Sequence, residues 1–213
     1  MGQSKIKNKT REERVLSILK QRGVKVITKE RSDAFISWTR KHTAKMTGIE
    51  IEHYSNDPET LIGIIVFDIT DHDYSIAILA RDRKMRFRYI DGKTGLTKQQ
   101  ARKLLIEKIQ YYSNITGVCI FPQGDEDKDG YGIDLFNIQA EESKLNSTFK
   151  ILQTNRCWTP AKRIITEMMR NYEDIDRNFV QQFQTSAFDA RLWELYLYNV
   201  FLEEGLYIER PKP

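Results

Sequence analysis

Three runs of strand-like residues, joined by short polar links, constrain the fold of this chain most strongly. Residues 61–67 are continuously apolar, as in a strand that is covered on both faces. Residues 74–80 follow, and residues 86–90 alternate basic and aromatic side chains before ending in isoleucine. Because short links join neighbouring antiparallel strands, the sequence predicts that these three strands form a meander.

Further elements precede the meander. Thr10 and Glu13 have the spacing of a helix capping box, and Gly23 is suited to end the helix that they begin. Strands are predicted at residues 24–28 and 49–54, where β-branched or alternating apolar residues occur. The N-terminal part therefore combines at least one helix with a sheet.

Two further patterns complete this N-terminal part. Thr97 and Gln100 predict the start of a second capped helix, and residues 117–121 predict a last strand. Residues 32–48 are ambiguous, because their apolar spacing fits either a helix or the beginning of a strand.

The C-terminal part has helical patterns. Thr159 precedes a proline that suits the first turn of a helix, and Asp174 is placed to cap another helix. Residues 186–204 form the most hydrophobic helical pattern, and residues 206–208 resemble the start of a strand. A strand without a partner suggests a fragment, or a chain that a partner completes.

The expected fold class is α+β, with an N-terminal antiparallel or mixed sheet and helices, followed by a mostly helical C-terminal region. We expect an α+β domain over residues 1–121 and an acidic connecting segment over residues 122–158, where periodicity is weak. Residues 159–213 form the expected helical region.

Composition limits the class of protein. The chain has 213 residues, of which 40% are hydrophobic, and this is enough to form a substantial core. Its longest apolar run, residues 61–67, is too short to cross a bilayer, and the N-terminus lacks the pattern of a signal peptide. Two cysteines, Cys119 and Cys157, fit a reducing compartment. We therefore expect a soluble cytoplasmic protein that is not inserted in a membrane.

Charge is unevenly distributed along the chain. Residues 1–50 carry 13 Lys and Arg against 5 Asp and Glu, residues 81–108 carry 10 against 3, and residues 121–145 carry 2 against 7. A local basic excess can form a surface that contacts phosphates, although such clusters are often ordinary solvated faces. The candidate nucleic-acid-binding residues are Arg81, Arg83, Lys84, Arg86, Arg88, Lys98, Arg102 and Lys103.

Glu194 is the candidate catalytic residue. It is the only charged residue between Leu192 and Leu202, in an otherwise apolar and aromatic helical pattern. A carboxylate in such surroundings must be paired, bound to a metal or protonated, because burying an unpaired charge is costly. The alternative is a partly exposed Glu194 that pairs with Arg191 or with another basic neighbour.

The same helix resembles part of a known superfamily. The sequence FVQQFQTSAFDARLWELYLY at residues 179–198, followed by EGLYI at residues 204–208, is similar to the opening of a restriction-endonuclease-like, or PD-(D/E)XK, module in some bacterial proteins. That opening consists of a helix with a glutamate, a glycine and the first core strand. By this resemblance Glu194 matches the helix glutamate, which helps to hold the divalent ion.

The resemblance also implies what this chain lacks. The metal-binding aspartate and the (D/E)XK strand of the superfamily are expected beyond Pro213. We therefore expect no cofactor in this chain, with Mg²⁺ bound only if the nuclease module is completed, and an activity restricted to binding.

An acidic turn offers a second candidate metal site. Asp125, Asp127 and Asp129, followed by Gly130, resemble the start of a calcium-binding loop. The twelfth position is Phe136 in place of a bidentate glutamate, so an ordinary solvated turn is the alternative.

Three functions follow from these patterns. The leading hypothesis is a nucleic-acid-associated, non-catalytic module of a bacterial protein related to PD-(D/E)XK nucleases. The first alternative is a protein-interaction module, which docks its C-terminal helix and strand onto a partner or a second copy. The second alternative is a divergent metal-dependent nuclease, which requires Glu12, Asp33 and Asp68 to converge.

Overall fold

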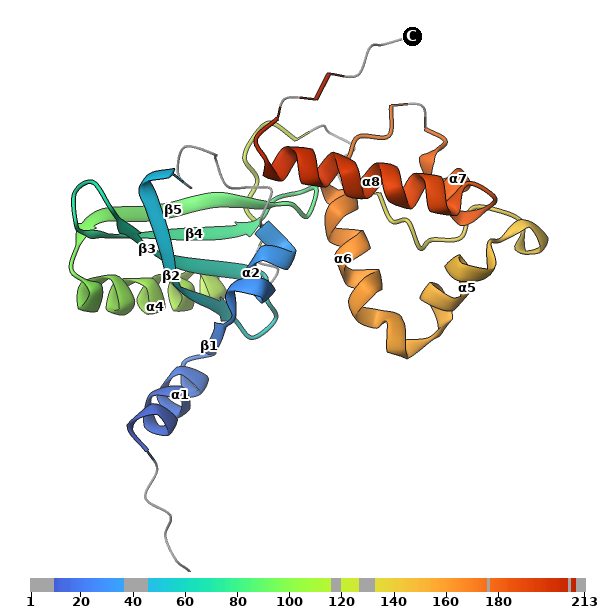
Figure 1. Cartoon of the computed structure of the whole chain (residues 1–213). Coiled ribbons are helices and arrows are strands. Elements are labelled where there is room, and N and C mark those ends of the chain that lie inside the picture. Colours follow the sequence, from blue (N-terminus) through green and yellow to red (C-terminus); the bar gives the residue numbers. More distant parts are fainter. Residues whose placement is uncertain are drawn as a thin grey trace, which may run out of the picture. The chain divides into compact units, whose positions relative to one another are not determined.

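The computed structural model of the chain describes residues 10–36, 46–115, 120–126, 133–175, 177–206 and 208–209. An antiparallel sheet precedes a mostly helical C-terminal part, which confirms the predicted α+β class (Figure 1). The chain divides into two compact units. We call them the sheet unit (Met1–Lys29, Gly48–Ala80 and Tyr89–Cys119) and the helical unit (Glu30–Thr47, Arg81–Arg88 and Ile120–Pro213).

The five described strands lie in the sheet in the order in which they occur in the chain. They are β1 (Val24–Ile27), β2 (Gly48–Asn56), β3 (Leu61–Asp68), β4 (Tyr74–Arg81) and β5 (Phe87–Leu96). The central strand β3 pairs antiparallel with β4, with Ile64 opposite Ala77. The predicted meander is therefore confirmed, and its last strand extends further than predicted, to Leu96.

Helix α4 (Lys98–Ile115) covers one face of the sheet (Figure 1). Its Leu105 and Ile109 are fully buried against the strands. A Cβ at Gly63 of β3 would lie 2.9 Å from the Cδ1 atoms of both side chains. Glycine at this position therefore lets the helix approach the sheet closely.

The predicted capping boxes are present. Thr10 Oγ1 accepts a hydrogen bond of 3.2 Å from the Glu13 amide, and Glu13 accepts in return from the Thr10 amide, at the start of α1 (Arg11–Gln21). Thr97 and Gln100 form the same reciprocal pair at the start of α4. Both helices thus begin where local hydrogen bonding satisfies backbone donors that no helical turn can satisfy.

The helical unit contains the helices of the C-terminal half and one earlier helix, which includes residues 32–36 of the ambiguous range 32–48. In chain order the described elements are α2 (Lys29–Ile36), the 3₁₀ helix η2 (Glu142–Lys144), α5 (Ser147–Thr154), the 3₁₀ helix η3 (Arg156–Trp158), α6 (Thr159–Arg170), α7 (Phe179–Gln184) and α8 (Phe188–Glu203). Residues 37–45 lie outside the described part of the chain.

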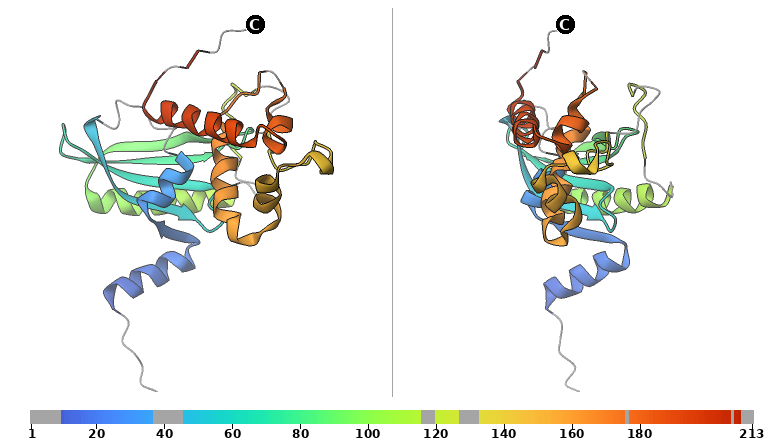
Figure 2. Two further views of the ribbon diagram at one scale, coloured as in Figure 1. Left: turned by 45° about the vertical axis from the view of Figure 1, so that its right-hand side comes forward. Right: turned by 90° about the vertical axis from the view of Figure 1, so that its right-hand side faces the viewer.

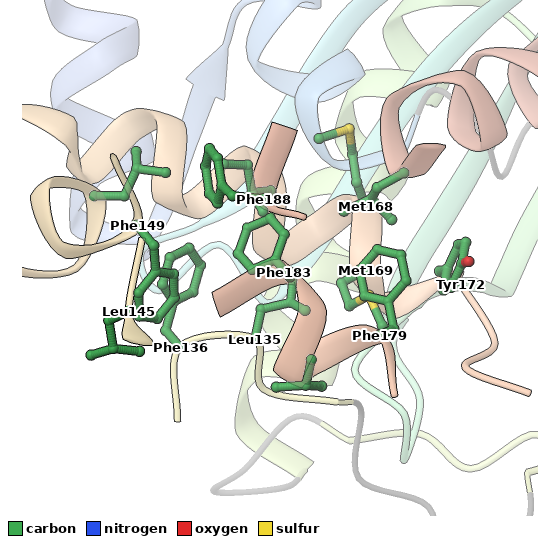
Figure 3. Packing of buried hydrophobic residues seen from close by; sticks show 14 residues of the cluster. Leu135, Phe136, Leu145, Phe149, Met168, Met169, Tyr172, Phe179, Phe183 and Phe188 are labelled. Atoms are coloured by element: carbon green, nitrogen blue, oxygen red, sulfur yellow. The ribbon is translucent and has the colours of Figure 1, made fainter. Parts of the chain in front are cut away.

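A phenylalanine cluster forms the core of the helical unit (Figure 3). Phe183 of α7 is fully buried, and its ring lies 4.9–6.4 Å, between centroids, from the rings of Phe136, Phe149, Phe179 and Phe188. These contacts join α5, α7 and α8 to the loop that precedes η2. The core is therefore assembled from residues that extend from Leu135 to Leu195 in the chain.

The predicted connecting segment contributes directly to this core. Its buried residues are Leu135, Phe136, Leu145, Phe149 and Leu152. The described residues 133–158 thus pack as part of the helical unit. The division of the chain into domains over residues 1–121, 122–158 and 159–213 stays a prediction.

Gln184 fixes the loop of this segment to α7. The side chain is fully buried, and its Nε2 atom donates to the carbonyls of Leu135 (2.9 Å) and Asn137 (2.7 Å). Its Oε1 atom accepts from the amides of Gln139 (2.8 Å) and Ala140 (3.2 Å). One side chain therefore satisfies four backbone groups of a loop that has no secondary structure to satisfy them.

The predicted strands at residues 117–121 and 206–208 differ from what the structure describes. Ile120 forms an isolated parallel bridge with Arg81, and the Phe121 amide donates to the Arg81 carbonyl at 2.7 Å, while residues 117–119 lie outside the described part. The predicted strand at residues 206–208 is wrong for its two described residues, Leu206 and Ile208, which belong to no strand.

The physical reason is the ending of α8. Gly205 adopts a φ of +75°, and the Leu206 amide turns back to donate to the Phe201 carbonyl at 2.9 Å. This closure occupies the Leu206 amide, which a strand would need for pairing with a neighbour.

Candidate nucleic-acid interface

Arg81, the first residue of the predicted basic surface, is buried in an ion pair. Its Nη1 and Nη2 atoms donate to the Glu167 carboxylate at 2.6 and 2.7 Å, and Nη1 also donates to the Met85 carbonyl. The guanidinium carbon lies 3.7 Å from the centroid of the Phe87 ring. Since both charged side chains are almost inaccessible to solvent, Arg81 does not present its charge to a ligand.

Arg170 completes this cluster. Its Nη1 atom donates to both Glu167 oxygens, at 2.9 and 3.0 Å, and to the Met85 carbonyl at 3.2 Å. Burial and the neighbouring Arg81 charge lower the pKa of Arg170. One carboxylate thus binds two guanidinium groups, which ties α6 to the turn between β4 and β5 within the helical unit.

Arg86 and Arg88 are also paired with acidic residues. The fully buried Asp82 accepts from the backbone amide and the Nε atom of Arg86, at 2.9 and 2.8 Å. Arg88 donates to Asp125 at 2.9 Å, and this hydrogen bond lowers the pKa of Asp125. Asp125, predicted as a metal ligand, therefore binds an arginine that was predicted to contact phosphate.

Lys98 and Arg102 face Glu52 in the sheet unit. Arg102 donates to Glu52 through Nε at 2.7 Å and also through Nη2, and Lys98 Nζ lies 3.7 Å from the same carboxylate. Tyr54 donates a further hydrogen bond of 2.7 Å. Although burial alone would raise it, hydrogen bonds from Arg102 and Tyr54 hold the pKa of Glu52 below its usual value of 4.5.

This lowered pKa makes the stability of the sheet unit dependent on pH. Because the folded carboxyl titrates below its unfolded value, it stabilises the unit above about pH 4.5, and this contribution is lost as pH falls through the folded pKa. We expect Glu52→Gln to lower the free energy of unfolding at pH 7 by about 0.5–1 kcal/mol, since Arg102 is half exposed. Urea unfolding should show this difference from the parent chain shrinking as the pH falls below about 4.5. Glu107→Gln, at an exposed ion pair, is the matched control, and a Glu52→Gln deficit that persists at low pH would contradict the assignment.

The remaining predicted cations differ in exposure. Lys103 Nζ lies 4.0 Å from Glu107 in an exposed pair, Lys84 is partly buried, and Arg83 is exposed. The predicted basic stretch is also divided, because its first part belongs to the helical unit and Lys98–Lys108 to the sheet unit. Most of its positive charge is thus balanced by acidic residues of its own unit.

Glu194 is paired in the structure. Its carboxylate accepts hydrogen bonds from the Tyr172 hydroxyl and from Nη1 of Arg191, which itself also donates to Gln182. The side chain is about one third exposed. Pairing with Arg191 was the alternative left open by the sequence, and it is the arrangement observed.

No group of three or more potential metal-binding side chains occurs within the described residues. Asp127, Asp129 and the Glu12 side chain lie outside that part. Asp68 accepts hydrogen bonds from the amides of Thr70 and Asp71 in a turn after β3.

The chain turns at η3, between α5 and α6 (Figures 1 and 2). This turn and the two flanking helices carry a second group of basic residues, which the sequence analysis did not single out. We call it the basic corner, and it consists of Lys150, Arg156, Trp158, Lys162 and Arg163. Among the described residues none of its four cations forms an ion pair, in contrast to the predicted stretch. Lys162 is partly covered, with Nζ 4.6 Å from the centroid of Phe136, and the other three cations are exposed.

Local hydrogen bonds hold the corner in place. Asn155 Oδ1 accepts from the Cys157 amide at 2.9 Å, the Asn155 carbonyl accepts from the Trp158 amide at 3.1 Å, and Thr159 Oγ1 donates to the Arg156 carbonyl at 2.8 Å. The flanking helices are anchored in the core by residues such as Phe149 and Ile165. The corner therefore presents its cations from a rigid support.

No protein-family model, curated protein or solved structure matches this chain. In the described part of the chain, no helix combines the length and the apolar character needed to cross a bilayer.

The sequence does contain a signal for the basic corner. Between Leu145 and Thr166 it has four basic residues and no acidic residue. The excess of +4 is smaller than that of residues 81–108, but no acidic neighbour along this stretch can neutralise it. For finding cations without ion pairs, the absence of acidic residues along the stretch was therefore more informative than the size of the basic excess.

Proposed function

We propose that this chain binds nucleic acid through the basic corner. The observation that carries the proposal is the contrast between paired cations in the predicted basic stretch and unpaired cations at the corner. A cation that already binds a carboxylate gains little by moving to a phosphate, whereas a solvated cation releases condensed counterions from the nucleic acid.

Local geometry supports the same proposal. Helix α6 begins at the corner without a side-chain cap, so the positive end of its dipole adds to the field of the four cations. The hydrogen bonds around Asn155 and Thr159 limit the entropy that binding would cost. The corner also carries the aromatic side chain of Trp158, and protein surfaces that bind nucleic acid combine cations with such aromatic side chains.

The proposal includes the relation to PD-(D/E)XK nucleases, with binding and without cleavage. Glu194 corresponds to the helix glutamate of that superfamily. Its carboxylate already binds Arg191 and Tyr172, so a divalent ion would have to displace both groups. Binding is therefore the part of the function that the described residues support.

Binding as a function of salt tests the proposal. Fluorescence anisotropy would measure the affinity for labelled single-stranded DNA, single-stranded RNA and duplex DNA between about 50 and 200 mM salt. With four phosphate contacts, we expect the logarithm of the association constant to fall with the logarithm of salt concentration with a slope of about −3. Absence of binding at the lowest salt would contradict the proposal, as would an affinity that does not respond to salt.

A second candidate function, self-association, is favoured by α8. Trp193, Tyr196 and Phe201 of this helix are 61%, 48% and 41% exposed, and the first two rings stack at 5.5 Å. Their spacing places Trp193 and Tyr196 on one side of the helix. A second copy is a suitable partner, since an isologous contact needs only one self-complementary patch.

Sedimentation of the parent chain and of a Trp193→Gln/Tyr196→Gln variant tests this second function. We expect the parent chain to associate with increasing concentration and the variant to remain monomeric. A parent chain that stays monomeric across the concentration range would exclude self-association through α8.

A further inference from the structure

Trp158 lies along the chain between the cations of the basic corner and has the properties of a stacking surface for a base. It is 50% exposed, although it belongs to η3, whose backbone is fixed by Asn155. Within the described residues its indole has no aromatic or cationic ring partner. By comparison, the exposed Trp193 already stacks on Tyr196.

We propose that the ligand of the basic corner is single-stranded nucleic acid, with one base stacked on Trp158. This inference rests on the proposed function and specifies its substrate class. Arg156 and Arg163 flank the indole along the chain and would contact the phosphates on either side of the stacked base. The faces of bases are accessible only when bases are unstacked, so a duplex cannot use Trp158 in this way.

Arrangement and rigidity support the stacking role. The Trp158 amide and the Thr159 hydroxyl are both held by backbone carbonyls of the preceding turn, so the indole is carried by an ordered backbone. A large aromatic side chain with few rotatable bonds loses little entropy on binding. The neighbouring cations have no ion pair among the described residues, so they are free to follow the phosphate chain.

An anionic lipid surface shares part of this chemistry, because it also attracts cations and tryptophan. Nucleic acid is favoured because the indole lies among the cations, in the stretch from Lys150 to Arg163. Helices that lie on membranes separate these residue types onto opposite faces. Vesicles therefore enter the test as a competing ligand.

The experiment compares Trp158→Ala and Trp158→Phe with the parent chain, and uses Trp193→Phe as the control. The ligands are an oligothymidylate single strand, a duplex of the same length, and vesicles that contain phosphatidylserine. We expect Trp158→Ala to weaken single-strand binding by about 5- to 150-fold, with Trp158→Phe retaining most of the affinity. The salt dependence should be unchanged in both variants, because no cation is removed. Single strands should also quench indole fluorescence in the parent chain more than in Trp158→Phe.

The outcomes distinguish failure of the inference alone from failure of the proposed function. Nucleic-acid binding that is unaffected by Trp158→Ala, or that favours the duplex, would overturn the inference and leave the proposed function intact. Absence of binding to any oligonucleotide, with or without binding to vesicles, would overturn both. Because Trp158 lies outside the buried core, circular dichroism should confirm that both variants remain folded.

Discussion

Glu167→Ala is expected to lower the free energy of unfolding of the helical unit by about 3–5 kcal/mol. Glu167 is buried and is the carboxylate partner of both Arg81 and Arg170. Without it, two guanidinium groups remain in a setting with little access to water. Urea unfolding, followed by tryptophan fluorescence, would measure the loss.

A double substitution separates pairing from general damage to the core. Arg81→Met combined with Glu167→Leu removes both buried charges, so it should cost less than Glu167→Ala alone, although Arg170 remains. Glu142→Ala, at an exposed carboxylate, is the control and should have little effect. A loss below about 1 kcal/mol for Glu167→Ala would show that the pair is not buried as described.

Gln184→Ala is expected to lower the free energy of unfolding by about 2–4 kcal/mol. The substitution leaves four backbone groups of the loop at residues 135–140 without their partner, in addition to creating a cavity. The loop would have to move towards water to satisfy those groups. That movement would also disturb the packing of Leu135 and Phe136 in the core.

Hydrogen exchange makes this prediction specific to the loop. The amides of Gln139 and Ala140 should exchange faster in the Gln184→Ala variant, while the amides of α4 in the sheet unit should keep their rates. Gln153→Ala removes a single hydrogen bond to the Phe136 carbonyl and should cost about 1 kcal/mol. Equal costs for both substitutions would contradict the role assigned to Gln184.

The sequence predicted the parts of the fold that depend on local physics. The capping boxes at Thr10 and Thr97 involve residues three apart, and the meander follows from an apolar run with short links. The predicted connecting segment was harder to interpret, because its core residues are spaced irregularly across a loop and short helices. Gln184, which fixes that loop, lies more than forty residues away in the chain.

The candidate site was predictable only in part, for a related reason. Arg81 pairs with a carboxylate 86 residues away, Arg102 with one 50 residues away and Arg88 with one 37 residues away. A count of charges along the chain cannot include such partners. The basic corner is different, since no acidic residue interrupts its stretch and its cations remain without ion pairs among the described residues.

One measurement compares the two basic regions directly, namely the salt dependence of single-strand binding for two matched triple variants. The corner variant carries the substitutions Lys150→Gln, Arg156→Gln and Arg163→Gln, and the stretch variant carries Lys98→Gln, Arg102→Gln and Lys103→Gln. For the corner variant we predict a salt slope shallower by about 2 and an affinity about 100-fold weaker at 0.1 M salt. The stretch variant should match the parent chain in both quantities. Loss of binding in the stretch variant with an unchanged corner variant would contradict the account.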